Sequence, residues 1–175
     1  MCFESCVLGR CFDCGLGRYS SSHAATECAA CAPGSFSSLP GQATCELCAV
    51  GGFCPTSGAA SASVFVQCPT GTYNPTRGAS SNASCLACPA GKASPVPGSI
   101  DVSACSPCLP GSYAPIGGLA ACLRTPAGTY QDESGATAHK ICRIGEYCPV
   151  RDPPRTTHAS LPFTDLLRPH AAMPS

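Results

Sequence analysis

The sequence contains no tryptophan and few large apolar side chains. Leu, Ile, Val and Phe together supply 28 of the 175 residues, which is below the roughly 20% at which a chain struggles to build a hydrophobic core. No apolar run reaches about 18 residues, the length needed to span a bilayer. We expect the apolar segment 64–66 to be a short extended stretch. The chain therefore predicts neither a conventional globular core nor insertion into a membrane.

Charge and helical periodicity are also scarce. Ten basic and ten acidic residues cancel, and Lys92 and Lys140 are the only lysines. Without a basic run, nucleic acid and anionic membrane surfaces are poorly supported as partners. Pro or Gly interrupts nearly every stretch, so we expect mostly turns with short strands. Residues 163–168 are the one plausible helical turn, with Thr164 as a candidate cap.

What the sequence does contain is 17 Cys, 18 Gly and 18 Pro in a repeated pattern, C-x-x-C-x-x-G-x-[YF]. We call the second cysteine of this pattern, or the residue aligned with it, the opening residue of a unit. The opening residues are Cys14, Cys31, Cys48, Cys68, Cys88, Cys108, Thr125 and Cys142. Such a regular recurrence indicates a repeat architecture.

Each unit carries three further markers after its opening residue. A first glycine follows by three residues, an aromatic residue by five in every unit but one, where Ala93 stands, and a second glycine by ten in most units. Pro and Gly after the opening residue are typical of a turn. We expect the aromatic ring to pack on a disulfide, and the second glycine to let the chain reverse toward a closing cysteine.

Two substitutions indicate how the cysteines pair. Thr125 and His139 occupy an opening and a closing position 14 residues apart, the separation also found in three cysteine pairs. A crosslink that is lost should lose both partners, because a leftover thiol is reactive. Each opening cysteine is thus predicted to bond the next closing one: Cys14–Cys28, Cys31–Cys45, Cys68–Cys85, Cys88–Cys105 and Cys108–Cys122. Loops of 14 and 17 residues suggest a three-residue insertion at the tip.

Two units carry an extra cysteine at the same spacing, which predicts Cys48–Cys54 and Cys142–Cys148. The alternative is an interlaced pattern with Cys48–Cys68 and Cys54–Cys85. Seven pairs leave Cys2, Cys6 and Cys11 over, and an odd number forces a free thiol or a partner outside the chain. We expect heterogeneous thiols confined to residues 1–11.

The pattern divides the chain into three parts. Residues 1–10 form a truncated cysteine-rich remnant, 11–148 the tandem repeats, and 149–175 a cysteine-free, proline-rich tail that is a linker or disordered. No charged and apolar leader precedes the first cysteines, so no signal peptide is predicted here. A disulfide-dense chain belongs to an oxidising compartment, and we therefore expect this sequence to be a fragment of a larger protein or the product of a gene model that begins too late.

The segments Cys68-Pro-Thr-Gly-Thr-Tyr-Asn, Cys85-Leu-Ala-Cys-Pro-Ala-Gly and Cys105-Ser-Pro-Cys-Leu-Pro-Gly-Ser-Tyr resemble the ephrin-receptor-like cysteine-rich repeat. That repeat is part of the wider growth-factor-receptor and tumour-necrosis-factor-receptor cysteine-rich group. The resemblance covers roughly 11–148 and implies an extracellular rod of stacked, small disulfide-rich modules without catalytic activity. The chain departs from it at Thr125, His139, Ala93 and Phe65. Phe65 stands where a closing cysteine belongs, and Cys54 is the candidate to replace it.

Two other classes use C-x-x-C pairs. Five such pairs and His139-x-x-Cys142 have spacing that suits zinc, yet each is followed by a turn and an aromatic residue rather than by a compact knuckle. A thiol oxidoreductase needs one such motif at a helix start, not five in turns. The histidines are scattered along the chain and suggest no hydrolytic triad: His23, His139, His158 and His170.

The sequence thus favours a non-enzymatic extracellular spacer or interaction module without cofactor, whose ligand, protein or glycan, it does not identify. The alternative is an intracellular zinc-binding repeat protein. Asn82-Ala83-Ser84 is an N-glycosylation acceptor sequence. The unit over 125–139 lacks a crosslink and carries a polar tip, so we expect it to open locally before its neighbours and to be the hinge of the rod.

Overall fold

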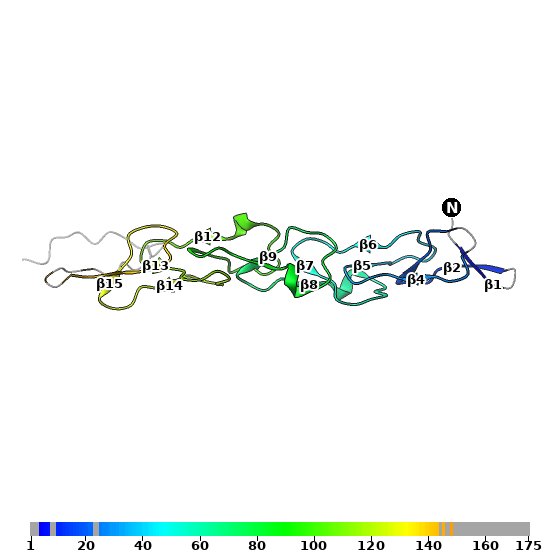
Figure 1. Cartoon of the computed structure of the whole chain (residues 1–175), viewed down its shortest axis with the longest axis horizontal. Helices are drawn as coiled ribbons and strands as arrows, with labels where there is room; N and C mark the ends of the chain where they lie inside the picture. Colours follow the sequence, from blue (N-terminus) through cyan, green and yellow to red (C-terminus); the bar gives the residue numbers. More distant parts are fainter. Residues whose placement is uncertain (1–3, 8–9, 23–24, 144, 146–147, 149–175) are drawn as a thin grey trace, which may run out of the picture.

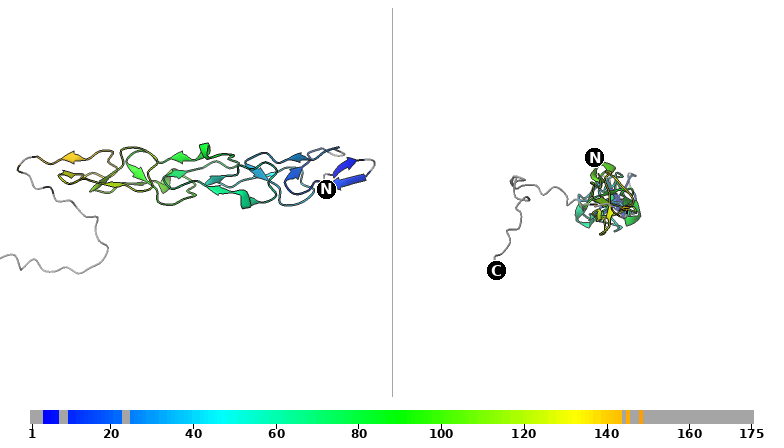
Figure 2. Two further views of the ribbon diagram at one scale, coloured as in Figure 1. Left: turned by 90° about the horizontal axis from the view of Figure 1, so that it is seen from below. Right: turned by 90° about the vertical axis from the view of Figure 1, so that its left-hand side faces the viewer.

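The computed structural model describes residues 4–7, 10–22, 25–143, 145 and 148. They form a long, thin rod in which successive units follow one another along a single axis (Figure 1). A view along that axis shows a narrow, compact cross-section (Figure 2). Helix is limited to three single 3-10 turns among the described residues, and the rest is short hairpins and turns. The predicted fold class, small disulfide-rich modules stacked in a rod, is confirmed.

Each of the seven units that open at Cys14 to Thr125 contributes one antiparallel hairpin of two-residue strands. The first strand ends on the residue five after the opening residue, and the second immediately precedes the next opening residue. In chain order the paired strands are β3 Arg18–Tyr19 with β4 Ala29–Ala30, β5 Ser35–Phe36 with β6 Glu46–Leu47, β7 Gly52–Phe53 with β8 Val66–Gln67, β9 Thr72–Tyr73 with β10 Leu86–Ala87, β11 Lys92–Ala93 with β12 Ser106–Pro107, β13 Ser112–Tyr113 with β14 Leu123–Arg124, and β15 Thr129–Tyr130 with β16 Lys140–Ile141.

A longer hairpin precedes these units. Strand β1 Glu4–Val7 pairs with β2 Arg10–Asp13, and their register places Cys6 opposite Cys11. The expected helical turn at 163–168, the tail 149–175 and Cys2 lie outside the described residues. The expectation of heterogeneous thiols within 1–11 therefore stays a prediction.

The three 17-residue loops differ from the shorter ones by a 3-10 turn. These turns are η1 Ala62–Val64, η2 Asn82–Ser84 and η3 Val102–Ala104. Each ends one residue before a closing position, so the insertion lies at the closing end of the loop. The expected extended stretch 64–66 is therefore only partly extended, because Val64 ends η1 whereas Val66 begins β8.

A ladder of backbone hydrogen bonds joins each unit to the next. The first glycine N–H donates to the carbonyl of the residue six after the next opening residue, at 2.7–2.9 Å: Gly17 to Ser37, Gly34 to Cys54, Gly51 to Asn74, Gly71 to Ser94, Gly91 to Ala114 and Gly111 to Gln131. That sixth residue in turn donates its own N–H to the residue after the second glycine of the following unit, as from Asn74 to Ser99 at 2.9 Å. The N–H of the second glycine donates to the carbonyl of the opening residue of the preceding unit, as from Gly98 to Cys68 at 2.9 Å.

The units also touch their second neighbours. A Cβ built on Gly17, Gly34, Gly51, Gly71 or Gly91 would lie 2.1–2.4 Å from the carbonyl oxygen of the second glycine two units further on. These glycines have φ values of 74° to 91°, which L side chains rarely adopt. Stacked repeats ordinarily contact only their immediate neighbours. In this rod each unit also contacts the unit after next, so the units pack more closely than in a simple array.

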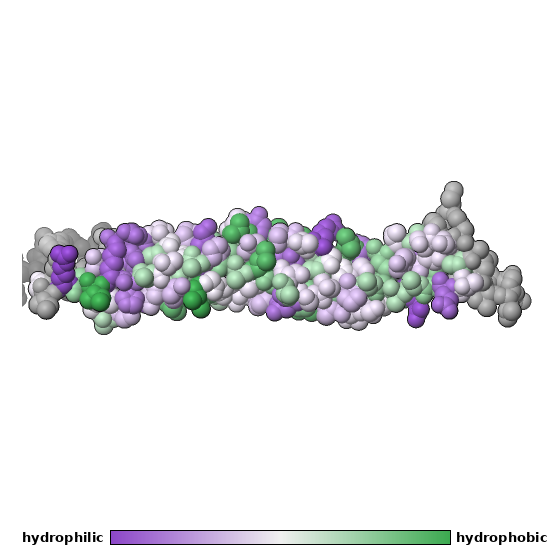
Figure 3. Space-filling model, viewed as in Figure 1, coloured by the Kyte–Doolittle hydropathy of each residue, from purple (hydrophilic) through white to green (hydrophobic). Residues whose placement is uncertain are grey.

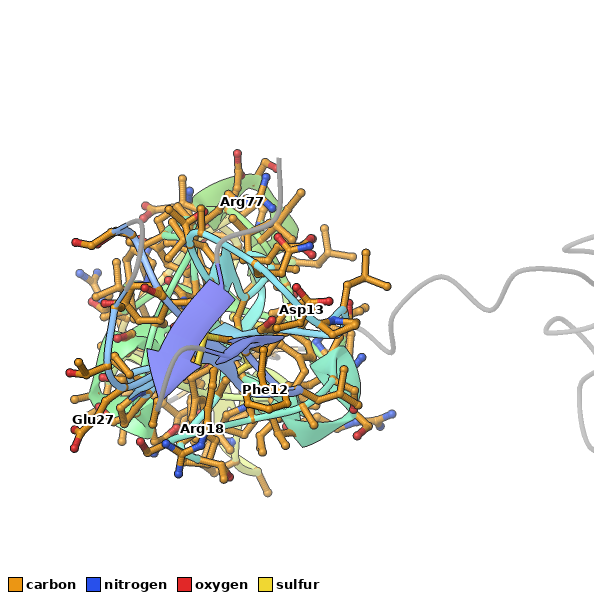
Figure 4. The ribbon with its side chains drawn as sticks, turned by 90° about the vertical axis from the view of Figure 1, so that its right-hand side faces the viewer. Phe12, Asp13, Arg18, Glu27 and Arg77 are labelled. Carbon is orange, nitrogen blue, oxygen red and sulfur yellow. A yellow bond between two sulfur atoms is a disulfide. The ribbon has the colours of Figure 1, made fainter. Side chains whose placement is uncertain are left out.

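Cystine takes the place of a hydrophobic core. The most buried side chains are cysteines together with small residues, as the composition predicts. The one apolar cluster among the described residues joins Phe36 to Cys48, Cys54 and Ala59, with Phe65 packed against it. Apolar and polar side chains alternate along the visible face without a continuous stripe of either (Figure 3). Seen end-on, Arg18, Glu27 and Arg77 point outward in different directions (Figure 4).

Candidate functional site

The cystine framework is the feature that the described residues build most regularly. The structure brings the cysteines together as Cys14–Cys28, Cys31–Cys45, Cys48–Cys54, Cys68–Cys85, Cys88–Cys105, Cys108–Cys122 and Cys142–Cys148. Their Cα–Cα distances are 5.6–6.4 Å, within the usual range for cystine. These are the pairs that the spacing predicts, and we propose them in preference to the interlaced pattern.

The two cysteines of a C-x-x-C motif point to different loops. In the motif at 28–31, for example, Cys28 closes one loop while Cys31 opens the next. A cystine sulfur cannot act as the thiolate that zinc requires. Within the part of the chain that the structure describes, no group of three or more His, Cys, Asp or Glu side chains could hold a metal ion. The disulfides therefore argue against the zinc alternative.

The unit that opens at Cys48 lacks the usual closing cysteine. Cys48 bonds Cys54 instead, and Phe65 occupies the closing position against the cluster that contains Phe36. Gly52 makes room for the ring, since a Cβ there would lie 2.4 Å from Phe65 Cζ. An apolar depression of about 290 Å³ lies over this cluster. Its lining is Phe36, Glu46, Leu47, Cys48, Ala49, Cys54, Ala62, Phe65 and Arg77.

The unit that opens at Thr125 has no disulfide. Thr125 is buried where other units place a cysteine, and its hydroxyl donates to the Gly111 carbonyl at 3.3 Å. The His139 ring stands edge-on to Tyr113, with ring centroids 5.0 Å apart and an interplanar angle of 67°. In this unit and in the one that opens at Cys48, an aromatic ring has replaced the closing cysteine and packs toward the aromatic residue of the preceding unit.

Polar contacts close the loop of this same unit. Gln131 donates from Nε2 to the Ala138 carbonyl at 2.6 Å and accepts from the Glu133 N–H at 2.9 Å. Lys140 Nζ donates to Asp132 Oδ1 at 2.7 Å and to Glu133 Oε1 at 2.9 Å. The hydrogen bond from Lys140 lowers the pKa of Asp132. The sequence predicted only an exposed polar tip here. Gln131, Asp132 and Glu133 instead form hydrogen bonds that join the two ends of the loop, although solvent screens the exposed ion pairs.

Sequence reasoning missed the residue six after each opening residue. It is buried in the seven units that open at Cys14 to Thr125: Ser20, Ser37, Cys54, Asn74, Ser94, Ala114 and Gln131. Asn74 shows what the position does, because its Nδ2 donates to the Gly52 carbonyl at 2.8 Å while its Oδ1 accepts from Thr76 N–H at 2.9 Å. The only sequence signal is that no large apolar residue stands at this position.

Comparison with known families agrees with this geometry. Residues 66–105 and 100–142 each match the model of the family described as tyrosine-protein kinase ephrin type A/B receptor-like. These segments are ephrin-receptor-like repeats. The second match includes the unit at 125–139 despite its missing disulfide, and the same ladder extends through the unmatched units that open at Cys14, Cys31 and Cys48. No curated protein matches the chain.

The ephrin-receptor-like repeats are a non-catalytic module family. Of the histidines weighed for catalysis, only His139 lies in the described part, and its ring packs edge-on against Tyr113. Among the described residues, no helix has the length and apolar character needed to cross a bilayer.

Proposed function

We propose that residues 11–148 act as a non-enzymatic extracellular spacer or protein-interaction module within a larger cell-surface or secreted protein. The observation that carries the proposal is the backbone ladder that continues from the unit opening at Cys14 to the unit opening at Thr125, in which every unit except the last contains a disulfide. Such a chain holds its two ends apart at a fixed distance. Its partner would be a protein or a glycan bound on the outside of the rod.

Bending the rod has a large energetic cost. Between the units that open at Cys68 and Cys88, three ladder bonds would have to lengthen together: Gly71 to Ser94, Asn74 to Ser99, and Gly98 to Cys68. Each buried backbone bond contributes about 1 kcal/mol net, and its unpaired groups would cost more. The contact between second neighbours opposes the same movement. A stiff spacer is thus favoured over a flexible linker, which would be rich in Gly and Ser without such bonds.

The disulfides support an extracellular location. They persist in oxidising compartments and are rare where thiols are kept reduced. A chain that buries so little apolar surface depends on its disulfides for stability. Each disulfide that closes a loop of this size stabilises the folded state by about 2–4 kcal/mol. We infer that the protein passes through the secretory pathway and works outside the cell or at its surface.

The proposal is tested by expressing the chain behind a cleavable secretory leader in eukaryotic cells. The expected product is a monomer with 14 cysteines protected from alkylation, no bound zinc, and the scattering profile of a rod. A product in which those 14 cysteines are alkylatable and which holds stoichiometric zinc would establish the intracellular alternative instead. A reduced sample provides the matched control for full alkylation.

A further inference from the structure

The 3-10 turn η2, Asn82–Ser84, lies at the closing end of the loop between Cys68 and Cys85. Asn82 and Ala83 are exposed, and among the described residues the Asn82 side chain has no hydrogen-bond partner. The turn is held by its own backbone, through bonds from Ser84 N–H to the Ser81 carbonyl at 3.2 Å and from Cys85 N–H to the Asn82 carbonyl at 3.0 Å. The Asn82 side chain is therefore not needed to maintain the fold.

The chain contains one other asparagine, and it shows the opposite environment. Asn74 is fully buried, and both ends of its amide are used in hydrogen bonds to Gly52 and Thr76. It is also followed by Pro75, which excludes it from the acceptor sequence. Asn74 therefore has a structural role inside the rod, whereas the Asn82 side chain is exposed on its surface.

The neighbouring turns show that η2 is unusual in its capping. In η1 the Ser61 side chain accepts a hydrogen bond from Ser63 N–H, and in η3 the Asp101 side chain accepts one from Ser103 N–H. The equivalent Ser81 makes no such side-chain bond. A bulky group at η2 would consequently displace neither a cap nor any bond of the ladder, whose members in this unit are Gly71, Asn74 and Gly78.

We propose that Asn82 carries an N-linked glycan. The bond formed joins Asn82 Nδ2 to the anomeric carbon of a sugar, and Nδ2 gives up one proton. The bond broken joins that carbon to the diphosphate oxygen of an activated glycosyl donor, which leaves with the electron pair. The inference rests on the proposed extracellular function, because the protein must enter the secretory pathway to meet this donor. The glycan would extend outward from one side of the rod and leave the ladder intact.

The test uses the full chain behind a cleavable leader in eukaryotic cells, with both secreted and cell-retained protein analysed. Intact mass is measured before and after treatment with a peptide N-glycosidase. The wild-type chain should lose the mass of one glycan and gain the deamidation of one residue. Asn82→Gln and Ser84→Ala should both abolish the modification, whereas Ser84→Thr should keep it. Alkylation must show the same protected cysteines in all variants, which separates loss of the glycan from misfolding.

A transplanted site provides the geometric control. Val102→Asn together with Ala104→Ser builds the same acceptor sequence into η3, which occupies the same place in the next unit, and should add a second glycan. A wild-type chain that has the 14 protected cysteines but is unmodified at Asn82 would overturn the inference while leaving the extracellular spacer in place. Alkylatable cysteines with bound zinc would instead overturn the proposed function.

Discussion

Replacing Gly71 by alanine tests whether contact between second neighbours holds the rod together. The new Cβ would lie 2.2 Å from the Gly118 carbonyl oxygen, 2.7 Å from its carbonyl carbon and 2.9 Å from the Leu119 carbonyl carbon. All three are backbone atoms, so no side chain can rotate away. The unit that opens at Cys108 must therefore separate from the unit that opens at Cys68.

The cost has two parts. Alanine at a φ of 80° is strained by about 1–2 kcal/mol. Separating the units also breaks or weakens the 2.7 Å bond from Gly71 to Ser94 and its neighbour from Asn74 to Ser99, at about 1 kcal/mol for each bond. We expect Gly71→Ala to destabilise this part of the rod by about 3–4 kcal/mol.

Two glycines supply matched controls. Gly128 has a φ of 78°, but no atom of the described residues lies within 4 Å of its built Cβ, so Gly128→Ala should show the strain of about 1–2 kcal/mol alone. Gly15 has neither a positive φ nor a close neighbour, and Gly15→Ala should be nearly neutral.

The assay is amide hydrogen exchange followed by NMR, because local opening is visible there even when the disulfides prevent global unfolding. In Gly71→Ala the amides of Gly71, Asn74 and Gly98 should lose protection, whereas in Gly128→Ala they should keep it. If both variants lose protection at these three amides to the same extent, the second-neighbour contact has no energetic role and the reasoning is refuted.

Other predictions concern the crosslinks and the unit without one. Thr125→Cys with His139→Cys should form a new disulfide worth about 3 kcal/mol, partly offset by the lost ring contact, and each single change should only add an alkylatable thiol. Limited proteolysis should cut first inside 125–139, and faster in Lys140→Ala; a first cut inside 31–45 would contradict this. The contribution of the pair made by Lys140 and Asp132 exists above the ordinary carboxyl pKa and disappears as the pH falls through the lowered pKa of Asp132, so cleavage by an acid-tolerant protease should increase below about pH 4. Non-reducing peptide mapping should recover the Cys48–Cys54 link; peptides joining Cys48 to residue 68 would support the interlaced pattern.

The sequence could predict the first glycines because a single backbone requirement governs them. A positive φ and a close carbonyl, as at Gly71, leave no alternative to glycine, so the position stays readable from unit to unit. The 14- and 17-residue loop lengths could also be predicted from the sequence, since each disulfide requires a cysteine at both ends of its loop. The extra residues proved to be 3-10 turns at the closing end of the loop, which loop length alone could not locate.

The buried sixth position could not be predicted for the opposite reason. Ser37, Cys54, Asn74, Ala114 and Gln131 share no side-chain chemistry, and what unites them is a backbone carbonyl that accepts from the preceding unit. Contacts between second neighbours leave no separate trace in the sequence either, because the first glycine is already required by its turn. The polar closure of 125–139 was missed because its parts read individually as exposed, solvated side chains.

The unit at 125–139 separates what the ladder does from what the disulfides do. Without a crosslink, it still keeps all three bonds to the preceding unit: Gly111 to Gln131 at 2.7 Å, Ala114 to Ala136 at 2.9 Å, and Gly135 to Cys108 at 2.7 Å. The crosslinked units have the same bonds at similar lengths, so the disulfide does not position one unit on the next. Its contribution is to limit the freedom of the unfolded loop, which matters in a chain with little apolar surface to bury. The spacing of the rod therefore depends on its glycines and backbone carbonyls, while the disulfides determine how long that arrangement persists, and losing one crosslink should soften the rod locally without changing its shape.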